Sequence, residues 1–126
     1  VPESNQPLFV NSVVKVSYND DPFSLINLLH KIEKSYGRKR KVLNGNRTID
    51  LDIIDFNGMK KNNLPILPHP RMQDRLFVLY PLYDIEPLWR HPISNKTIDS
   101  LIEEVKTVQK IKKIKWISWI IEFYLL

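Results

Sequence analysis

The chain has 126 residues, with 19 lysines and arginines against 14 aspartates and glutamates, which gives a net charge of +5 with neutral histidines. Hydrophobic residues make up 43% and charged residues 26%, typical values for a globular domain that exclude disorder, collagen and low complexity for the chain as a whole. Because cysteine is absent, a disulfide framework, a cysteine-ligated zinc site and a cysteine nucleophile are excluded, and a reducing compartment fits.

The N-terminal third of the chain predicts a strand followed by a helix. Residues 9–17 are rich in β-branched side chains, which favours a strand. Asp21 is a good N-cap, and Pro22 suits the first helical position, where its missing N–H costs nothing. An apolar stripe at helical spacing follows, formed by Leu25, Leu28, Leu29 and Ile32. We therefore expect a helix over residues 22–36, ended by Gly37.

A basic loop and a second strand come next. Residues 38–47 contain five basic residues and no acidic residue, and their glycine and asparagines favour a loop. Residues 48–56 are rich in isoleucine and end at the turn pair Asn57-Gly58. This segment predicts a second strand.

The second half of the chain has weaker local signals. Residues 60–75 are polar and broken by prolines, which excludes a helix or a central strand there. Residues 76–82 form a short apolar stretch interrupted by Pro81, and residues 95–105 predict a helix with one apolar face.

The last segment, residues 106–126, is basic and then apolar. Its final 11 residues are almost wholly apolar, but a bilayer-spanning helix needs about 20, so we expect no transmembrane span. We expect these residues to form a helix or strand that packs on this domain or on a partner. A segment lying at a membrane surface is the alternative.

Asp50 and Asp52 lie two residues apart in the second predicted strand. Strand geometry places their side chains on one face, about 6.5–7 Å apart, while Leu51 and Ile53 point into a core. Aspartate is depleted in strands, so two on one face call for an explanation. Such a pair suits Mg²⁺, which binds one or two carboxylates together with substrate phosphates. The alternative is an edge strand with one solvated face.

Basic side chains flank this acidic pair on both sides. They are Arg38, Arg40 and Arg47 before the pair, and His69, Arg71 and Arg75 after it. A guanidinium group can donate two parallel hydrogen bonds to the oxygens of one phosphate. Carboxylates, Mg²⁺, a polyphosphate and arginines, stacked in that order, would neutralise one another's charges. This is the electrostatic arrangement of phosphoryl transfer. No GxxxxGK[ST] loop is present, so the sequence is not that of a P-loop enzyme.

Four segments resemble, in order, motifs of the 6-hydroxymethyl-7,8-dihydropterin pyrophosphokinase family. Residues 45–54 resemble its G-P-R-T-[IL]-D-[LI]-D-[IL]-[IL] signature, and residues 6–13 its Q-P-x-[FY]-L-N-A-V segment. Glu33 with residues 37–40 resembles I-E-x-x-x-G-R-x-R, and residues 67–79 resemble P-H-P-R-[LM]-x-x-R-x-F-V-L. The resemblance covers roughly residues 1–102.

The resemblance implies an activity and its cofactors. The enzyme would transfer pyrophosphate from ATP to 6-hydroxymethyl-7,8-dihydropterin and release AMP, as a cytoplasmic step of folate biosynthesis. Asp50 and Asp52 would bind two Mg²⁺ ions with the ATP. Arg38 and Arg40, on a loop that closes over the site, would contact the phosphates and act in catalysis with the two aspartates.

The resemblance also implies the binding residues. ATP would be bound by Glu33, Arg47, Ile53, His69 and Arg75. The pterin ring would lie between Phe9 and Phe77, with Asn11 hydrogen-bonded to its edge, roles that suit flat aromatic faces and an amide. Arg71 is expected to form a surface ion pair.

The fold implied is α+β, a ferredoxin-like sandwich with the element order βαββαβ. The opening strand, helix and strand of the family have no counterpart here, so we expect an N-terminally truncated version that retains the second βαβ half. That domain would cover residues 1–105, with 106–126 as a tail of unknown role. In the family the first strand is central, so we expect the strands at 9–17 and 48–56 to flank an empty position with unpaired backbone groups.

Three hypotheses for the function stay open. The first is an active pyrophosphokinase, with an upstream segment, fused or separate, or another folate enzyme as a candidate partner. The second is an inactive remnant of a split or frameshifted gene. The third is a basic nucleic-acid-binding module, suggested by residues 38–47 and the tail. We expect no nucleic-acid partner, because the lysines partly follow the composition and no aromatic-basic RNA motif is present.

Overall fold

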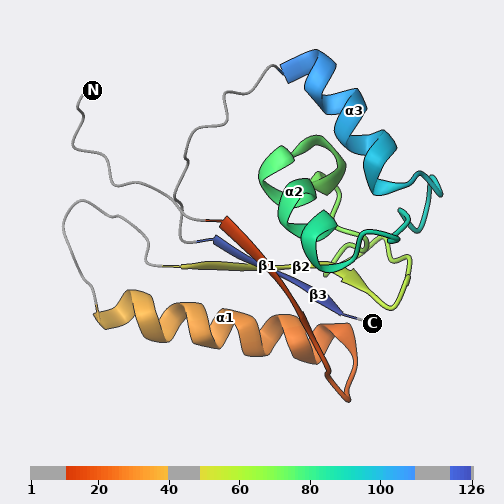
Figure 1. Ribbon diagram of the computed structural model, residues 1–126. Helices are drawn as coiled ribbons and strands as arrows, with labels where there is room; N and C mark the ends of the chain where they lie inside the picture. Colours follow the sequence, from red (N-terminus) through yellow and green to blue (C-terminus); the bar gives the residue numbers. More distant parts are fainter. Residues whose placement is uncertain (1–10, 40–48, 110–119, 126) are drawn as a thin grey trace, which may run out of the picture.

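The computed structural model describes residues 11–39, 49–109 and 120–125 (Figure 1). Its elements are, in chain order, β1 (Asn11–Val16), α1 (Pro22–Lys39), β2 (Asp50–Phe56), the 3-10 turn η1 (Met72–Asp74), α2 (Leu76–Ile85), α3 (Ile98–Gln109) and β3 (Ile120–Leu125). Helix α1 covers one face of the sheet, and α2 and α3 lie on the other side (Figure 1). This mixture of helices and strands agrees with the expected α+β class.

Strand β3 lies between β1 and β2 and is parallel to both, so the order of the sheet is β1-β3-β2. The expectation that β1 and β2 flank an empty position was therefore wrong, because β3 pairs with both of them. It was wrong because the partner strand comes from residues 120–125, in a segment whose role could not be assigned from the sequence. Helix α3 also runs on to Gln109, past the expected domain boundary at residue 105.

Helix α1 forms where the sequence predicts it, and it runs further. The Asp21 side chain accepts a hydrogen bond from the Ser24 amide at 2.8 Å, which caps the helix start. The expected end at Gly37 was wrong, because the helix continues to Lys39. A glycine inside a helix costs only about 1 kcal/mol relative to alanine, so it permits a stop without enforcing one.

Strand β2 contributes to two hydrophobic clusters, one on each face of the sheet. The α1-side cluster comprises Leu25, Leu29, Leu51, Ile53, Phe56 and Leu67. Ile54 instead joins the cluster formed largely by α2 and α3. This is the place that strict alternation gives Ile54, on the face opposite Leu51 and Ile53. A register shift between Ile53 and Asp55 then changes the pattern. One extra residue in the strand returns Phe56 to the face of Leu51 and Ile53, where strict alternation would have placed it opposite.

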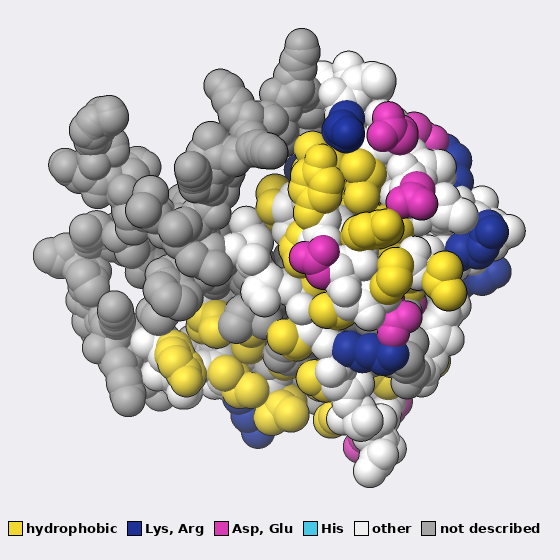
Figure 2. All heavy atoms as spheres, viewed as in Figure 1, with side chains coloured by type: hydrophobic (Ala, Val, Ile, Leu, Met, Phe, Trp, Pro, Cys, Tyr) yellow, Lys and Arg dark blue, Asp and Glu magenta, His cyan; other side chains and the backbone are white. Residues whose placement is uncertain are grey.

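Helix α2 was not recognised as a helix in the sequence. Its interior contains Pro81, which normally disfavours a helix, but Leu76, Val78, Leu79 and Leu82 are buried against the rest of the fold. Apolar side chains also gather on the outer surface of α2 (Figure 2). These are Phe77, Tyr80, Tyr83 and Ile85, each between 39% and 46% exposed.

Helix α3 starts three residues later than expected. Asn95 has a left-handed backbone, with φ of 63°, so it cannot begin a helix. Thr97 caps the helix instead, because its hydroxyl oxygen accepts a hydrogen bond from the Ser100 amide at 3.2 Å. Ile98, Leu101, Ile102 and Val105 are buried, as the apolar face of this helix predicts.

A buried polar group ties the segment after α2 to strand β2. The carboxylate of Asp55 accepts hydrogen bonds from Trp89 Nε1 at 2.8 Å and from the Gly58 amide at 3.0 Å. The ring of His91 meets Trp89 edge-on at 5.9 Å, and its Nδ1 accepts hydrogen bonds from the Ile93 and Ser94 amides. Burial raises the pKa of Asp55, and the bond from Trp89 opposes this shift.

We predict that Trp89→Phe lowers the free energy of unfolding by about 1–3 kcal/mol, because one oxygen of the buried Asp55 carboxylate loses its donor. Urea unfolding followed by circular dichroism measures this loss. The control is Leu88→Ala at the neighbouring position, which is 89% exposed and should change stability by less than about 0.5 kcal/mol. Equal losses in the two variants would contradict the prediction.

We also predict that His91 makes the fold less stable in mild acid. Burial lowers the pKa of His91, against the attraction of Asp55, so the unfolded chain takes up the proton first as the pH falls. The stability that neutral His91 contributes is therefore complete above about pH 6.5 and is lost as the pH falls through the lowered pKa. Between about pH 7.5 and 5.5, Tm should therefore fall more steeply in the wild type than in His91→Asn. Parallel Tm curves for the two proteins would rule this out.

Candidate functional site

The sheet brings Asn11, Asp50 and Asp52 to one face, here called the carboxylate face. The strand register aligns Asn11 with Asp50 through Ile120, and Val13 with Asp52 through Glu122. Residues aligned in this way across a parallel sheet share a face. Since neighbouring strands lie about 4.8 Å apart, Asn11 and Asp50 are separated by about 10 Å across the sheet.

The two aspartates have the arrangement that their spacing predicts. Leu51 and Ile53 are each 3% exposed and belong to the α1-side cluster, whereas Asp50 and Asp52 are half-buried on the opposite face. Asp52 keeps 42% of its side chain exposed, so solvent and ligands can reach its carboxylate.

His69 is fixed beside Asp52 by hydrogen bonds at its backbone and its ring. Its amide donates to the carbonyl oxygen of Ile54 at 2.9 Å, which attaches the proline-rich segment to β2. Its Nδ1 accepts a hydrogen bond from the Arg71 amide at 3.1 Å, and its Nε2 lies 4.0 Å from Asp52 Oδ2. Because Nδ1 acts as an acceptor, the proton of the neutral ring is on Nε2, the nitrogen nearest Asp52.

The pKa of His69 is lowered by burial. The carboxylate of Asp52 opposes this shift, and the positive charges of Arg75 and Arg71 add to it. The site therefore favours a neutral imidazole, which can donate one hydrogen bond toward Asp52 or toward an anionic ligand.

Arg75 and Phe77 lie next to each other where helix α2 begins. The guanidinium carbon of Arg75 is 5.5 Å from the centroid of the Phe77 ring, within the range of a cation–π contact. Phe77 is 39% exposed, so part of its ring surface is free to contact a ligand. Arg71 is exposed and contributes its backbone amide to His69.

The amide oxygen of Asn11 is buried and has no hydrogen-bond partner within the part of the chain that the structure describes. Most buried polar atoms in proteins are paired, because an unpaired one loses its hydration without compensation. Asn11 therefore presents an acceptor at the carboxylate face that a donor on a ligand would satisfy.

Two expected ATP-binding residues have side chains engaged in contacts within the fold. The Ile53 side chain is buried in the α1-side cluster and does not reach the carboxylate face. Glu33 Oε2 accepts a hydrogen bond from the Leu51 amide at 2.7 Å. Sequence reasoning missed this contact, since no local pattern links a helix residue to a strand amide 18 positions away.

Several expected site residues lie wholly or partly outside the described part of the chain. Phe9, Arg40 and Arg47 lie outside the described residues, and Arg38 is placed by its backbone alone, in the last turn of α1. Within the described ranges, no group of three or more histidine, cysteine, aspartate or glutamate side chains could hold a metal ion by itself. Two carboxylates completed by phosphate oxygens and water nevertheless fit the ligands that Mg²⁺ prefers. No described helix is long and apolar enough to span a bilayer.

Comparison with known proteins gives one consistent result. The model of the 7,8-dihydro-6-hydroxymethylpterin-pyrophosphokinase family matches residues 1–87. A 2-amino-4-hydroxy-6-hydroxymethyldihydropteridine pyrophosphokinase of Synechocystis is 42% identical over 101 residues, which are 79% of this chain and 52% of the relative. That of Pseudomonas aeruginosa is 46% identical over 91 residues, 71% of this chain and 56% of the relative.

A third relative is much longer than this chain. The folic acid synthesis protein fol1 of Pneumocystis carinii is 43% identical over 103 residues, which are 80% of this chain and 14% of that protein. The chain thus spans about half the length of the two bacterial relatives and a small part of the fungal one.

We predict that His69 is neutral at pH 7 and carries its proton on Nε2, because Nδ1 accepts the Arg71 amide and burial lowers the ring's pKa. Two-dimensional ¹H–¹⁵N spectra of the histidine side chains distinguish the tautomers through the ¹⁵N shifts. His30, which is exposed, provides the internal comparison and should show a mixture of the two tautomers. A proton on Nδ1 of His69 would contradict the prediction.

Proposed function

The chain belongs to the 7,8-dihydro-6-hydroxymethylpterin-pyrophosphokinase family, and we propose on that premise that its carboxylate face is a pyrophosphoryl-transfer site. The proposed reaction moves pyrophosphate from ATP to the hydroxymethyl oxygen of 6-hydroxymethyl-7,8-dihydropterin and releases AMP. The role is a cytoplasmic step of folate biosynthesis, and the absence of cysteine is compatible with that location.

One observation supports this proposal above the others, namely the shared face of Asn11, Asp50 and Asp52. A buried amide oxygen without a described partner lies across the sheet from a pair of carboxylates. A substrate with hydrogen-bond donors at one end and an oxygen nucleophile at the other could contact both. The pterin has N–H groups on its ring and a hydroxymethyl group on the opposite side.

In the proposed site, Asp50 and Asp52 hold Mg²⁺ with the phosphate oxygens of ATP, two ions being the number expected in the family. The bound metal supplies neutralisation of the phosphate charge and a lower pKa for the attacking hydroxyl. The protein's own contribution is position, because both carboxylates start from one rigid strand on a fixed face.

The phosphates are surrounded by basic groups in this proposal. His69 donates a hydrogen bond from Nε2 next to Asp52, and Arg75 adds a positive charge at the start of α2. Arg38, Arg40 and Arg47 extend this set as proposals from the family motifs. Glu33 and Ile53 are also proposed to lie near ATP. The Glu33 carboxylate accepts a hydrogen bond from the Leu51 amide, and the Ile53 side chain is buried in the α1-side cluster, so a contact of Ile53 with the nucleotide would involve its other atoms.

The pterin is proposed to stack between Phe77 and Phe9, with its edge on Asn11. The exposed part of the Phe77 ring and the Asn11 oxygen, which has no partner among the described residues, support two of these three contacts. A flat heterocycle between aromatic faces gains dispersion and quadrupole attraction without ordering many rotatable bonds.

The finer fold assignment is also a proposal. The elements β1, α1 and β2 form one βαβ half of a ferredoxin-like sandwich, corresponding to the second half of the family's fold. The position between β1 and β2, which β3 takes here, corresponds to the family's first strand. The proposed partner is an upstream segment or another folate enzyme, fused or separate. In support, the matched residues make up only 14% of the folic acid synthesis protein of Pneumocystis carinii, so this relative is much longer than the matched region.

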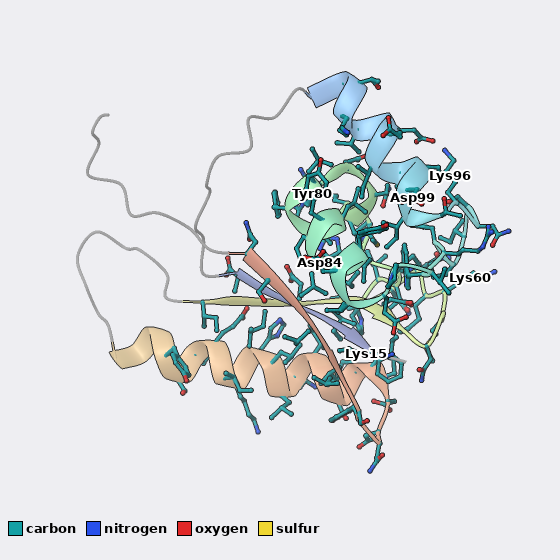
Figure 3. The ribbon with its side chains drawn as sticks, viewed as in Figure 1. Lys15, Lys60, Tyr80, Asp84, Lys96 and Asp99 are labelled. Carbon is teal, nitrogen blue, oxygen red and sulfur yellow. The ribbon has the colours of Figure 1, made fainter. Side chains whose placement is uncertain are left out.

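We predict that Asp52→Asn reduces pterin-dependent AMP formation from ATP at least about 100-fold, because the metal-binding charge is lost while the shape is kept. A coupled assay for AMP with and without pterin measures it, and circular dichroism checks the fold. The matched control is Asp99→Asn on the exposed first turn of α3 (Figure 3), with an expected change below about twofold. Pterin-dependent AMP formation that is unchanged in Asp52→Asn would reject the proposed function.

A further inference from the structure

We propose that Glu33 is a positioning residue that holds the backbone between the two aspartates at the geometry metal binding needs. The proposal rests on the proposed function and deepens it, because it assigns a task to a residue of α1, the helix that covers the opposite face of the sheet. Its basis is the 2.7 Å hydrogen bond that the Leu51 amide donates to Glu33 Oε2.

The Leu51 amide needs a partner outside the sheet. Among the strands that the structure describes, in the order β1-β3-β2, β2 has β3 on one side and no strand on the other. Amides of successive residues in a strand point to opposite sides, so alternate amides of β2 point away from β3. Leu51 is 3% exposed, and leaving its buried N–H unpaired would be unfavourable. A carboxylate is a stronger acceptor for this amide than a neutral group.

The hydrogen bond acts on the peptide unit that joins Asp50 to Leu51. Fixing the Leu51 nitrogen fixes the plane of this peptide and hence the direction in which the Asp50 side chain leaves the strand. Helix α1 holds Glu33 firmly, because Leu29 is 1% exposed in the same cluster as Leu51, with Ile32 packed against it. The aspartate pair is thus attached to a rigid helix through one bond.

A second support acts on the other end of the pair. The His69 amide bonds the Ile54 carbonyl, and its Nε2 lies 4.0 Å from Asp52. Asp50 and Asp52 are therefore held from α1 on one side and from the proline-rich segment on the other. Mg²⁺ demands near-ideal octahedral geometry, so small shifts of either carboxylate weaken its binding.

The experiment compares wild type, Glu33→Ala and Glu33→Gln, with Glu103→Ala on α3 as a matched loss of one exposed carboxylate. Amide hydrogen exchange is read at Leu51 and, for global unfolding, at Leu79. Mg²⁺ is titrated in the presence of ATP, without pterin, and binding is followed by the amide shifts of residues 50–52. ATP binding is measured separately at saturating Mg²⁺.

In Glu33→Ala we expect exchange at Leu51, but not at Leu79, to rise at least about tenfold, and half-saturation by Mg²⁺ to need about ten times more metal. Glu33→Gln keeps an acceptor oxygen, so both values should stay within about threefold of wild type. Glu103→Ala should match wild type in both.

Three results would overturn the proposal. The first is an unchanged Leu51 exchange rate in Glu33→Ala, and the second is a Glu33→Gln variant as impaired as Glu33→Ala. The third is a change in ATP binding by Glu33→Ala at saturating Mg²⁺ with no change in the Mg²⁺ concentration needed for half-saturation. The last would indicate a direct contact with the nucleotide. None of these readouts needs turnover, so a wild type that binds Mg²⁺ and ATP but forms no AMP would refute the proposed function and leave this test intact. A wild type that binds no Mg²⁺ with ATP would refute both.

Discussion

The two-residue alternation of strand β2 is the constraint on which the site depends. Leu51 and Ile53 bury their side chains against α1, and the same geometry then directs Asp50 and Asp52 to the other face. A slip of one residue would bury two carboxylates and expose two apolar side chains, so the hydrophobic core enforces the position of the acidic pair. The register shift after Ile53 lets the strand change its burial pattern without disturbing this segment.

Groups from three separate parts of the chain converge on this short segment. Glu33 comes from α1, His69 from the proline-rich connection, and Asn11 from the start of β1. The first two are bonded to backbone atoms of β2, so their places follow from the strand itself. Asn11 lies on the carboxylate face because it and Asp50 both pair with Ile120 of β3. The site is therefore a product of the sheet rather than of one loop.

Local signals in the sequence predicted the elements that depend on local interactions. Helix α1 has its cap and stripe within a few residues, and the alternation of Asp50 and Asp52 needs only the strand period. Helix α2 was missed because burial of its apolar residues outweighs Pro81, and that burial is a tertiary effect. Neither the place of β3 nor the bond between Glu33 and Leu51 could be predicted, because both join residues far apart in the chain. The resemblance to the family named the aspartates, but not what supports them.

The place of β3 has a consequence for how the molecule reaches its fold. Strands β1 and β2 have no hydrogen bonds to each other in the sheet order and are joined only through a strand from the other end of the described chain. During synthesis, helix α1 and its two neighbouring strands emerge from the ribosome long before their common partner does. Because β3 pairs with strands far earlier in the chain, these contacts have a high contact order. Such pairing forms slowly, which leaves an interval in which chaperones or intermolecular strand pairing compete with correct folding.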